Sequence, residues 1–216
     1  MKVLSFLCPV FELGQIATNP RVNYSTSLQT AAPFELSTVT WRNQSDFDII
    51  RFLDEGRFST VFLGEDLRTH DEVVLKVLHP TYLGKIKREL RMLHTCRELK
   101  FFIKLMAVVK CRSLRTVALI LESLGPEVEC LGHHSTLLSA EEVRHYMCCL
   151  LTGLKECHQQ GIMHRDVKNR NIIVNRATQQ LRIIDLGLSE TYVHQKQFNP
   201  SVCSKSFKGS VPMLSR

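Results

Sequence analysis

Residues 162–187 read IMHRDVKNRNIIVNRATQQLRIIDLG, and this stretch decides the fold of the chain. It contains the triplet HRD ending at Asp166, then Asn171 five positions later, and the triplet DLG beginning at Asp185. The spacing predicts a site for phosphoryl transfer, a reaction in which the protein mainly positions a hydroxyl and neutralises charge. Asp166 would accept the hydroxyl proton, and Lys168 would meet the phosphate as a point charge. Asn171 and Asp185 would offer hard oxygen ligands to Mg²⁺.

Each of these motifs has a simpler explanation when it stands alone. A lone Asp-x-Gly is usually a turn, and a lone HRD triplet can be a surface salt bridge. The full set keeps Asn171 in register and has apolar runs at residues 172–174 and 181–184 on either side. Because such a combination is hard to obtain by chance, phosphoryl transfer is the preferred interpretation.

Length and composition favour a globular chain. The 216 residues are 44% hydrophobic, which is enough for one domain or for two small lobes sharing a core. The formal net charge is +7 and the pI is near 9.1. Such a balance suits acidic partners such as nucleotides, acidic peptides or nucleic acid, but selects none of them by itself. Nucleic acid is the weaker alternative.

The eight cysteines are scattered without a CxxC pair and are predicted to be reduced and mostly buried. Cys130 with His133 and His134 could suggest a metal site, but no second ligand pair lies nearby, so a structural loop is preferred. The start MKVLSFLCPVF resembles a secretory signal, although Ser5 and Pro9 interrupt its apolar run and no convincing cleavage site follows. No transmembrane helix is predicted, and the expected location is the cytoplasm and nucleus.

The first half of the chain predicts an irregular arm followed by a sheet. Residues 1–40 are rich in Ser, Thr, Asn and Pro with little periodicity. Strands are predicted at residues 47–53, 60–63, 72–78, 103–109 and 116–121. The turn DEGRFSTV lies where a glycine-rich loop would cover nucleotide phosphates, with Gly56 letting the backbone approach them closely. Asp54 replaces the first glycine and adds bulk and negative charge there.

The remaining nucleotide contacts are predicted around Lys76, which the strand pattern places under that turn. Residues 85–93 (KIKRELRML) are predicted to be helical, and Glu89 would pair with Lys76 and hold it on the α- and β-phosphates. Residues 121–124, including Glu122, would form a hinge whose backbone binds adenine. The adenine slot would be lined by aliphatic residues that otherwise count as core: Leu53, Val61, Val74, Leu121, Leu124, Ile173 and Ile184.

A strong helix is predicted after Ser139, because Glu142 three residues later completes a capping box. Apolar residues follow at helical spacing: Val143, Met147, Leu150, Leu151 and Leu154. Residues 146–151 (YMCCLL) are apolar around most of the helix circumference. This helix is therefore predicted to be buried on several sides.

From about Arg21 to Gly209 the sequence resembles the catalytic alpha subunits of casein kinase 2, which are acidophilic serine/threonine protein kinases. The matching segments are WRNQSDFDI, GRFSTVF, KIKREL, GIMHRDVK, LRIIDLGLSE and SFKG. The resemblance implies an α+β, two-lobed protein-kinase-like fold with a five-stranded antiparallel N-lobe sheet, one N-lobe helix and an incomplete helical C-lobe. The implied bounds are residues 1–40 for the arm, 41–121 for the N-lobe and 122–216 for the C-lobe.

The resemblance also implies an activity and partners. The expected reaction is Mg²⁺-dependent transfer of the γ-phosphate of ATP to Ser or Thr in acidic proteins or peptides, with GTP as an open alternative to ATP. A regulatory beta subunit is a further implied partner, and no membrane is involved. In that family an N-terminal arm packs on the activation segment and keeps the enzyme active without phosphorylation, a role open to residues 21–41. By analogy the site roles fall on Lys76, Glu89, Asp166, Lys168, Asn171 and Asp185.

Three departures from the family lie within the matching span. Asp54 predicts weaker nucleotide binding. Leu186 replaces a tryptophan, but leucine can still pack in a hydrophobic spine with Leu93, Leu105 and His164. The basic cluster that recognises acidic substrates is thinned at residues 79–84 and at Ser201, and five of its residues remain: Lys85, Lys87, Arg88, Lys205 and Lys208.

The largest departure follows Gly209, where the family continues with Pro-Glu-Leu-Leu and further helices while this chain reads SVPMLSR. The glutamate that closes the activation segment is then missing, as are the helices that would bury the far side of residues 139–154. Two functions are therefore predicted. The first is an active serine/threonine protein kinase. The alternative is a truncated, catalytically weak or inactive module that binds nucleotide or a regulatory partner.

Overall fold

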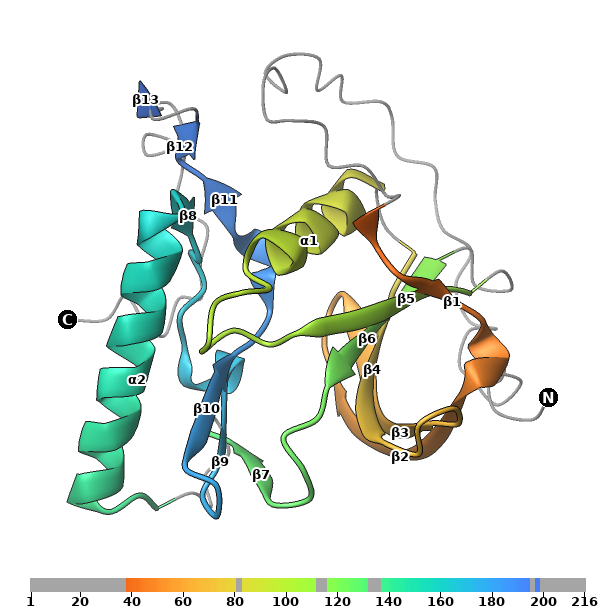
Figure 1. Cartoon of the computed structure of the whole chain (residues 1–216), viewed down its shortest axis with the longest axis horizontal. Helices are drawn as coiled ribbons and strands as arrows, with labels where there is room; N and C mark the ends of the chain where they lie inside the picture. The colour runs from red at the N-terminus through yellow and green to blue at the C-terminus, as the bar shows by residue number, and fades with distance from the viewer. Residues whose placement is uncertain (1–37, 81–82, 112–115, 132–136, 195–196, 199–216) are drawn as a thin grey trace.

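The computed structural model describes residues 38–80, 83–111, 116–131, 137–194 and 197–198 (Figure 1). A large sheet with helix α1 (Leu83–Thr95) forms one part of the molecule, and helix α2 (Ala140–Gln159) with short strands forms the other. The expected two-part α+β arrangement is therefore present. The predictions for residues 1–37, for His133 and His134, and for Ser201, Lys205 and Lys208 lie outside the described residues, and the boundaries at residues 41 and 122 stay predictions.

The large sheet has six strands in the order β1-β5-β6-β4-β3-β2. Their bounds are β1 Trp41–Arg42, β2 Phe47–Glu55, β3 Ser59–Asp66, β4 Glu72–Leu78, β5 Leu105–Cys111 and β6 Thr116–Glu122. The five predicted strands are all present and each is antiparallel to its neighbours among them. The predicted number of five strands is wrong, because β1 adds a sixth that runs parallel to β5.

Strand β1 was missed because two residues are too short to show an alternating pattern. Its side chains are nevertheless well held. Arg42 Nη2 donates to Asp66 Oδ1 at 2.9 Å, and Arg42 Nε lies 3.1 Å from Asp46 Oδ2 in the 3₁₀ helix η3 (Gln44–Asp46). Lys110 Nζ lies 4.9 Å from the centre of the Trp41 ring. Ion pairs and a cation–π contact hold this edge of the sheet. The pattern of hydrophobic residues in the sequence does not indicate such contacts.

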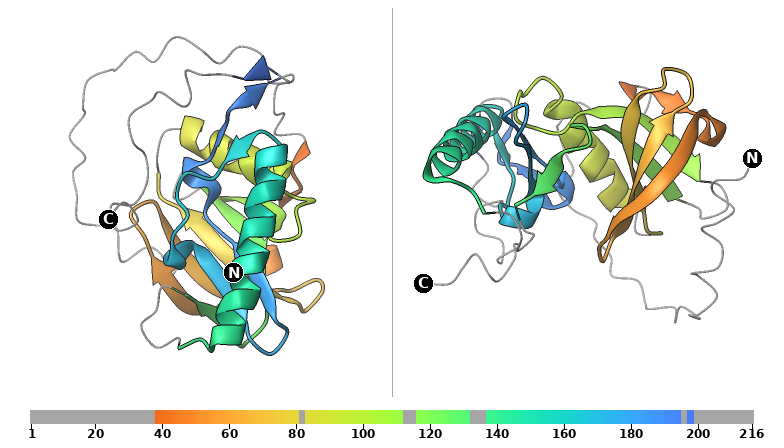
Figure 2. Two further views of the ribbon diagram at one scale, coloured as in Figure 1. Left: turned by 90° about the vertical axis from the view of Figure 1, so that its left-hand side faces the viewer. Right: turned by 90° about the horizontal axis from the view of Figure 1, so that it is seen from below.

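Alternate side chains of the sheet point to opposite faces and serve two cores. Val108 and Leu119 join the larger core, which includes Leu90 of α1. Their neighbours Val109 and Ala118 belong to a second core on the other face. Helix α1 lies against the first face (Figure 2), and its span of Leu83–Thr95 contains the predicted residues 85–93. The helix therefore stands between the sheet and the catalytic stretch.

Short strands carry the stretch that opened the sequence. A three-stranded sheet has the order β10-β9-β7, with bounds β7 Val128–Cys130, β9 Ile172–Asn175 and β10 Gln180–Ile183. Strand β8 (Ile162–Met163) pairs with β11 (Glu190–Thr191), and β12 (Val193–His194) pairs with β13 (Gln197–Phe198). The 3₁₀ helices η4 (Asn169–Asn171) and η5 (Leu186–Leu188) complete this part. Both apolar runs of the sequence are thus strands, β9 and β10, which pair with each other directly after the catalytic loop.

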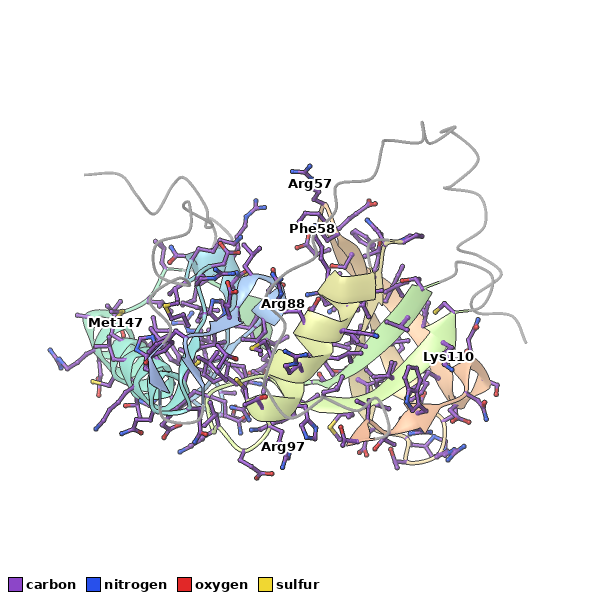
Figure 3. All side chains as sticks on the ribbon, turned by 90° about the horizontal axis from the view of Figure 1, so that it is seen from above. Arg57, Phe58, Arg88, Arg97, Lys110 and Met147 are labelled. Atoms are coloured by element: carbon purple, nitrogen blue, oxygen red, sulfur yellow. The ribbon has the colours of Figure 1, made fainter. Side chains whose placement is uncertain are left out.

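Helix α2 begins as predicted, with Ser139 as its N-cap and Glu142 completing the capping box. Its inner face packs on β8 and β10, and a Cβ added at Gly153 would lie only 2.8 Å from the Cβ of Phe101. The predicted burial on several sides is wrong within the described part of the chain. Its outer side chains Val143, Met147 and Leu151 are 45%, 47% and 59% exposed, and Figure 3 shows Met147 on the outer side. The sequence pattern correctly predicts that this face of the helix is apolar. It does not predict whether another segment covers that face.

Two further sequence predictions can be compared with the described residues. Cys96, Cys111 and Cys157 are buried, Cys130 and Cys149 are half-buried, and Cys148 is exposed, and all of these are free thiols. The predicted burial thus holds for half of them. None of the helices in the described segments is long and apolar enough to cross a membrane.

The cap of α2 predicts a pH dependence of stability. Arg176 Nε donates to Glu142 Oε1 at 2.6 Å, and the Ser139 amide donates to Oε2 at 2.8 Å. These bonds lower the pKa of Glu142 to about 2, from an ordinary value of 4.5. Because the folded-state pKa is depressed, the stabilisation is complete above about pH 4.5 and is lost as the pH falls toward 2.

Glu142→Gln is therefore expected to flatten the pH dependence of the melting temperature across this acidic window. Circular dichroism melts at a series of pH values would measure it. Glu141→Gln, which removes the neighbouring first-turn carboxylate, is the matched control and should follow the unmodified chain. Parallel curves for Glu142→Gln and the unmodified chain would contradict the expectation.

Candidate active site

The loop between β8 and β9 closes around the carboxylate of Asp166, which is 5% exposed. Lys168 Nζ donates to Asp166 Oδ2 at 2.7 Å, and Asn171 Nδ2 donates to the same oxygen at 3.0 Å. The Asn171 amide also donates to the backbone oxygen of Asp166 at 2.8 Å. Arg165 just before it has a φ of 64°, which turns the chain back sharply. Three residues predicted from spacing alone are thus in direct contact.

Asp185 is brought beside Asn171 by the pairing of β9 with β10. Ile172 lies opposite Ile183, and the amide of Ile184 donates to the carbonyl oxygen of Asn171 at 2.9 Å. Asp185 is the next residue and takes a left-handed conformation with a φ of 64°. The strand pairing therefore places one carboxylate and one carboxamide at the same end of the hairpin.

This donor set fits Mg²⁺, which binds through one or two protein oxygens and takes its other ligands from phosphate and water. Across the described ranges, no three His, Cys, Asp or Glu side chains gather into a group that could hold a metal ion. Asp185 and Asn171 supply hard oxygen donors of the kind that this ion prefers. The residues present therefore suit a magnesium ion that arrives with a phosphate ligand.

Lys76 of β4 bridges two acidic residues. Its Nζ donates to Glu89 Oε1 of α1 at 2.7 Å and to Asp185 Oδ1 at 3.0 Å. Burial alone would lower the pKa of Lys76, but the carboxylates of Glu89 and Asp185 outweigh it and raise the pKa above its ordinary value. Burial alone would likewise raise the pKa of Asp185, yet the Lys76 ammonium holds it below its ordinary value. The site thus carries one firmly charged cation between two carboxylates. The pair with Glu89 was expected from the sequence, whereas the contact with Asp185 was not.

The turn between β2 and β3, which was predicted to cover nucleotide phosphates, is built without most of the expected glycines. The amide of Gly56 donates to the Ser59 carbonyl at 2.8 Å, and Asp54 Oδ1 accepts from the Glu55 amide at 2.8 Å. A Cβ added at Gly56 would meet only the Ser59 oxygen, at an ordinary 3.7 Å. The turn itself therefore does not require glycine at position 56. The weaker nucleotide binding expected from Asp54 stays a prediction.

The predicted adenine slot is brought together in part. Val74 lies opposite Leu121 across β4 and β6, and both join the larger core with Ile173 and Ile184. Leu124 is buried just after β6. Leu53 and Val61 are half-buried on the β2–β3 hairpin, outside that cluster. The aliphatic residues chosen from the sequence thus come from both parts of the molecule, although several of them also serve the core.

The hinge is held by polar contacts that the sequence did not indicate. Glu122 was predicted to contribute backbone to adenine binding, but its side chain accepts from Arg182 Nε at 2.9 Å and from the Lys104 amide at 2.9 Å. Two residues further on, the Leu124 carbonyl accepts from Asn175 Nδ2 at 2.7 Å. These bonds tie the end of β6 to β9 and β10.

The predicted hydrophobic spine is packed. Leu93 and Leu186 are 2% and 0% exposed and share the larger core, with Leu105 packed against it. The His164 ring is 2% exposed, and its Nε2 lies 3.2 Å from the Ile184 carbonyl. Burial lowers the pKa of His164, so the imidazole is neutral near pH 7. Leu186 is therefore buried in the same core as Leu93, as the expected hydrophobic spine requires.

Two further residues of this region were not found by sequence reasoning. Arg165 Nη1 lies 2.5 Å from Glu190 Oε2, and Arg165 Nε donates to the Leu188 carbonyl at 2.8 Å. Phe102, which is fully buried, lies with its ring centre 6.4 Å from that of His164. Glu190 ends the segment LRIIDLGLSE but was given no role there, and Phe102 lies in none of the quoted segments. Only the fold shows that both lie beside the catalytic loop.

Comparison with known families agrees with this geometry. Residues 47–210, well over half of the chain, match the family model described as the protein kinase domain. The matched span begins at β2 and contains every site residue predicted above.

Proposed function

The chain belongs to the protein kinase family, and from this premise we propose that it transfers the γ-phosphate of ATP to Ser or Thr hydroxyls in acidic protein segments. The observation that supports this proposal best is that the charged and polar side chains of the site form two groups, one around Asp166 and one around Lys76. Lys168 and Asn171 converge on Asp166, while Lys76 joins Glu89 to Asp185. Positioning and charge neutralisation are the two tasks that phosphoryl transfer sets for a protein.

Asp166 accepts the proton of the attacking hydroxyl in this proposal. Its Oδ2 is held by Lys168 and Asn171, so the carboxylate is fixed in orientation before a substrate binds. Lys168 also places a positive charge next to the transferring phosphate. Lys76, oriented by Glu89, binds the nucleotide phosphates as a point charge.

Asn171 and Asp185 are the residues that would hold Mg²⁺, and protein kinase domains use this ion together with ATP. When bound, the ion supplies neutralisation of charge on the phosphates. Lys76 keeps Asp185 ionised, since it lowers the pKa of that carboxyl group. GTP in place of ATP remains the second nucleotide to test.

The preference for acidic substrates rests on exposed basic residues near the site. Lys85, Lys87 and Arg88 are exposed on α1, and Arg57 is exposed at the tip of the β2–β3 turn. Figure 3 shows Arg57 at the projecting tip of the β2–β3 hairpin and Arg88 beside α1. Such a concentration of positive charge raises the local concentration of acidic peptides.

A second candidate is a module that binds nucleotide or a regulatory partner with little or no turnover. The exposed apolar side chains Val143, Met147 and Leu151 on the outer face of α2 favour it, because contiguous apolar surface often marks an interaction site. Asp54, near the end of β2 and just before the β2–β3 turn, favours it as well, since its charge opposes phosphate.

Incubation of the purified chain with Mg-ATP and a serine peptide flanked by acidic residues tests the proposal. We expect phosphate incorporation detected by mass spectrometry, none into the matched alanine peptide, and less into a peptide with basic flanks. If Mg-ATP raises the melting temperature but no peptide is phosphorylated, the second candidate replaces the first. If Mg-ATP gives neither stabilisation nor transfer, the kinase proposal and the nucleotide-binding form of the second candidate are both overturned.

A further inference from the structure

His79, immediately after β4, makes three contacts with the nucleotide-covering turn, residues 56–60. Its backbone amide donates to the Phe58 carbonyl at 2.9 Å. Its Nδ1 lies 3.3 Å from the Arg57 carbonyl oxygen, and its Nε2 lies 3.0 Å from Thr60 Oγ1. Both ring nitrogens are therefore engaged with consecutive parts of one short turn.

The chemistry of the partners sets the tautomer of this ring. A carbonyl oxygen only accepts hydrogen bonds, so Nδ1 of His79 carries the hydrogen and donates to Arg57. In the neutral ring Nε2 then accepts from the Thr60 hydroxyl. The ring spans the turn from one side to the other, and its two bonds resist separation of the turn from the end of β4.

The same turn has a second attachment, to α1. Lys85 Nζ lies 4.4 Å from the centre of the Phe58 ring, and the guanidinium of Arg57 lies 5.4 Å from it. Figure 3 shows Arg57 and Phe58 projecting from the hairpin tip beside the first turn of α1. Phe58 is 47% exposed, so this contact holds the tip from outside and not by burial in a core.

These contacts matter because the turn lacks the glycines that make such loops pliable. Asp54 and Ser59 occupy the first and third glycine positions, and Gly56 alone remains. We propose that His79 is a positioning residue that holds residues 56–60 in their nucleotide-covering conformation before nucleotide binds. This role rests on the proposed function.

A turn that is already ordered loses little conformational freedom when a ligand arrives, which favours binding. Loss of the His79 side chain should therefore weaken nucleotide binding without touching the groups that perform the transfer. The Michaelis constant for ATP should rise while the turnover number changes little. A residue needed only for folding would instead lower the amount of active protein and leave the Michaelis constant of the folded fraction unchanged.

The first arm of the test needs no nucleotide. Trypsin cleaves after Arg57 only when the turn opens, so under native conditions the fragment that begins at Phe58 reports the opening. His79→Ala is expected to speed this cleavage roughly 5- to 25-fold, because each net hydrogen bond lost corresponds to a factor of about five. Thr60→Val, which removes only the Nε2 partner, should give about fivefold. His70→Asn, at the other end of the β3–β4 hairpin, is the matched control and should leave the rate unchanged.

The second arm measures nucleotide binding and kinetics on the same variants. His79→Ala should raise the dissociation constant for Mg-ATP about fivefold or more, with a fall in melting temperature of only about 2–8 °C from the one or two bonds lost. Thr60→Val should change both quantities to a smaller extent. Unchanged cleavage after Arg57 in His79→Ala would overturn the inference, as would faster cleavage with unaltered nucleotide affinity. An unmodified chain that binds no nucleotide would overturn the proposed function, while the proteolysis comparison would still decide whether His79 holds the turn.

Discussion

Asp166→Asn is expected to lower the rate of phosphate transfer by about 10²- to 10⁴-fold, the usual contribution of a general base. Asparagine has nearly the same shape as aspartate, but its side-chain nitrogen cannot accept a proton. Lys168 and Asn171 both donate to Asp166 Oδ2, and an asparagine that places its amide oxygen at this position can still accept both bonds. The Asn171 bond to the backbone oxygen of residue 166 does not depend on the carboxylate.

Initial rates of peptide phosphorylation at saturating Mg-ATP would measure this loss. The stabilisation by Mg-ATP in a thermal shift experiment should persist, because Lys76, Asn171 and Asp185 are untouched. Asp71→Asn, in the exposed turn between β3 and β4, is the matched control and should keep full activity. Phosphate incorporation that survives unchanged in Asp166→Asn would assign the reaction to another residue or to a contaminating enzyme.

Phe102→Ala is expected to cost about 3–5 kcal/mol of folding free energy, the usual range for a buried phenylalanine. The ring is fully buried in the larger core, which joins the sheet, α1, α2 and the catalytic strands. Its backbone forms a bridge with Ile183, and the flanking amides reinforce it: Ile103 N donates to Ile183 O at 3.1 Å, and Ile183 N to Phe101 O at 2.7 Å. Since a domain is usually stable by about 5–15 kcal/mol, this one change removes a large share.

Urea or thermal denaturation followed by circular dichroism would measure the loss. Phe52→Ala is the matched control, because that ring is 54% exposed and makes an edge contact with Phe62 at 6.1 Å between centres. We expect it to cost well under half as much. Comparable losses for the two variants would mean that the core around Phe102 is not the one that holds the two parts of the molecule together.

The contacts among the candidate catalytic residues could be anticipated because phosphoryl-transfer chemistry requires fixed spacing within one short stretch. Asp166, Lys168 and Asn171 lie within six residues of one another and meet through local contacts. Lys76 and Glu89 could be named because a strand and a helix with clear periodicity place them. The five longer strands and both helices were found for the same reason, since each has enough residues to show its period.

The remainder depended on contacts between distant segments. Glu122 and Arg182 are far apart in sequence, and nothing in either segment marks a pair. Arg165 with Glu190 is hidden in the same way. The exposure of the outer face of α2 could not be predicted either. An apolar face favours burial, but the sequence of the helix does not determine which other segment covers it.

Two hydrogen bonds across the hinge limit how often the two parts of the molecule can separate. For the two parts of the molecule to move apart, the bond from Arg182 to Glu122 and the bond from Asn175 to the Leu124 carbonyl must both break. A hinge without such side-chain hydrogen bonds would open more often. This hinge opens only when both bonds are broken at the same time. For the kinase activity proposed above, we therefore expect release of the used nucleotide to be no faster than opening of this hinge.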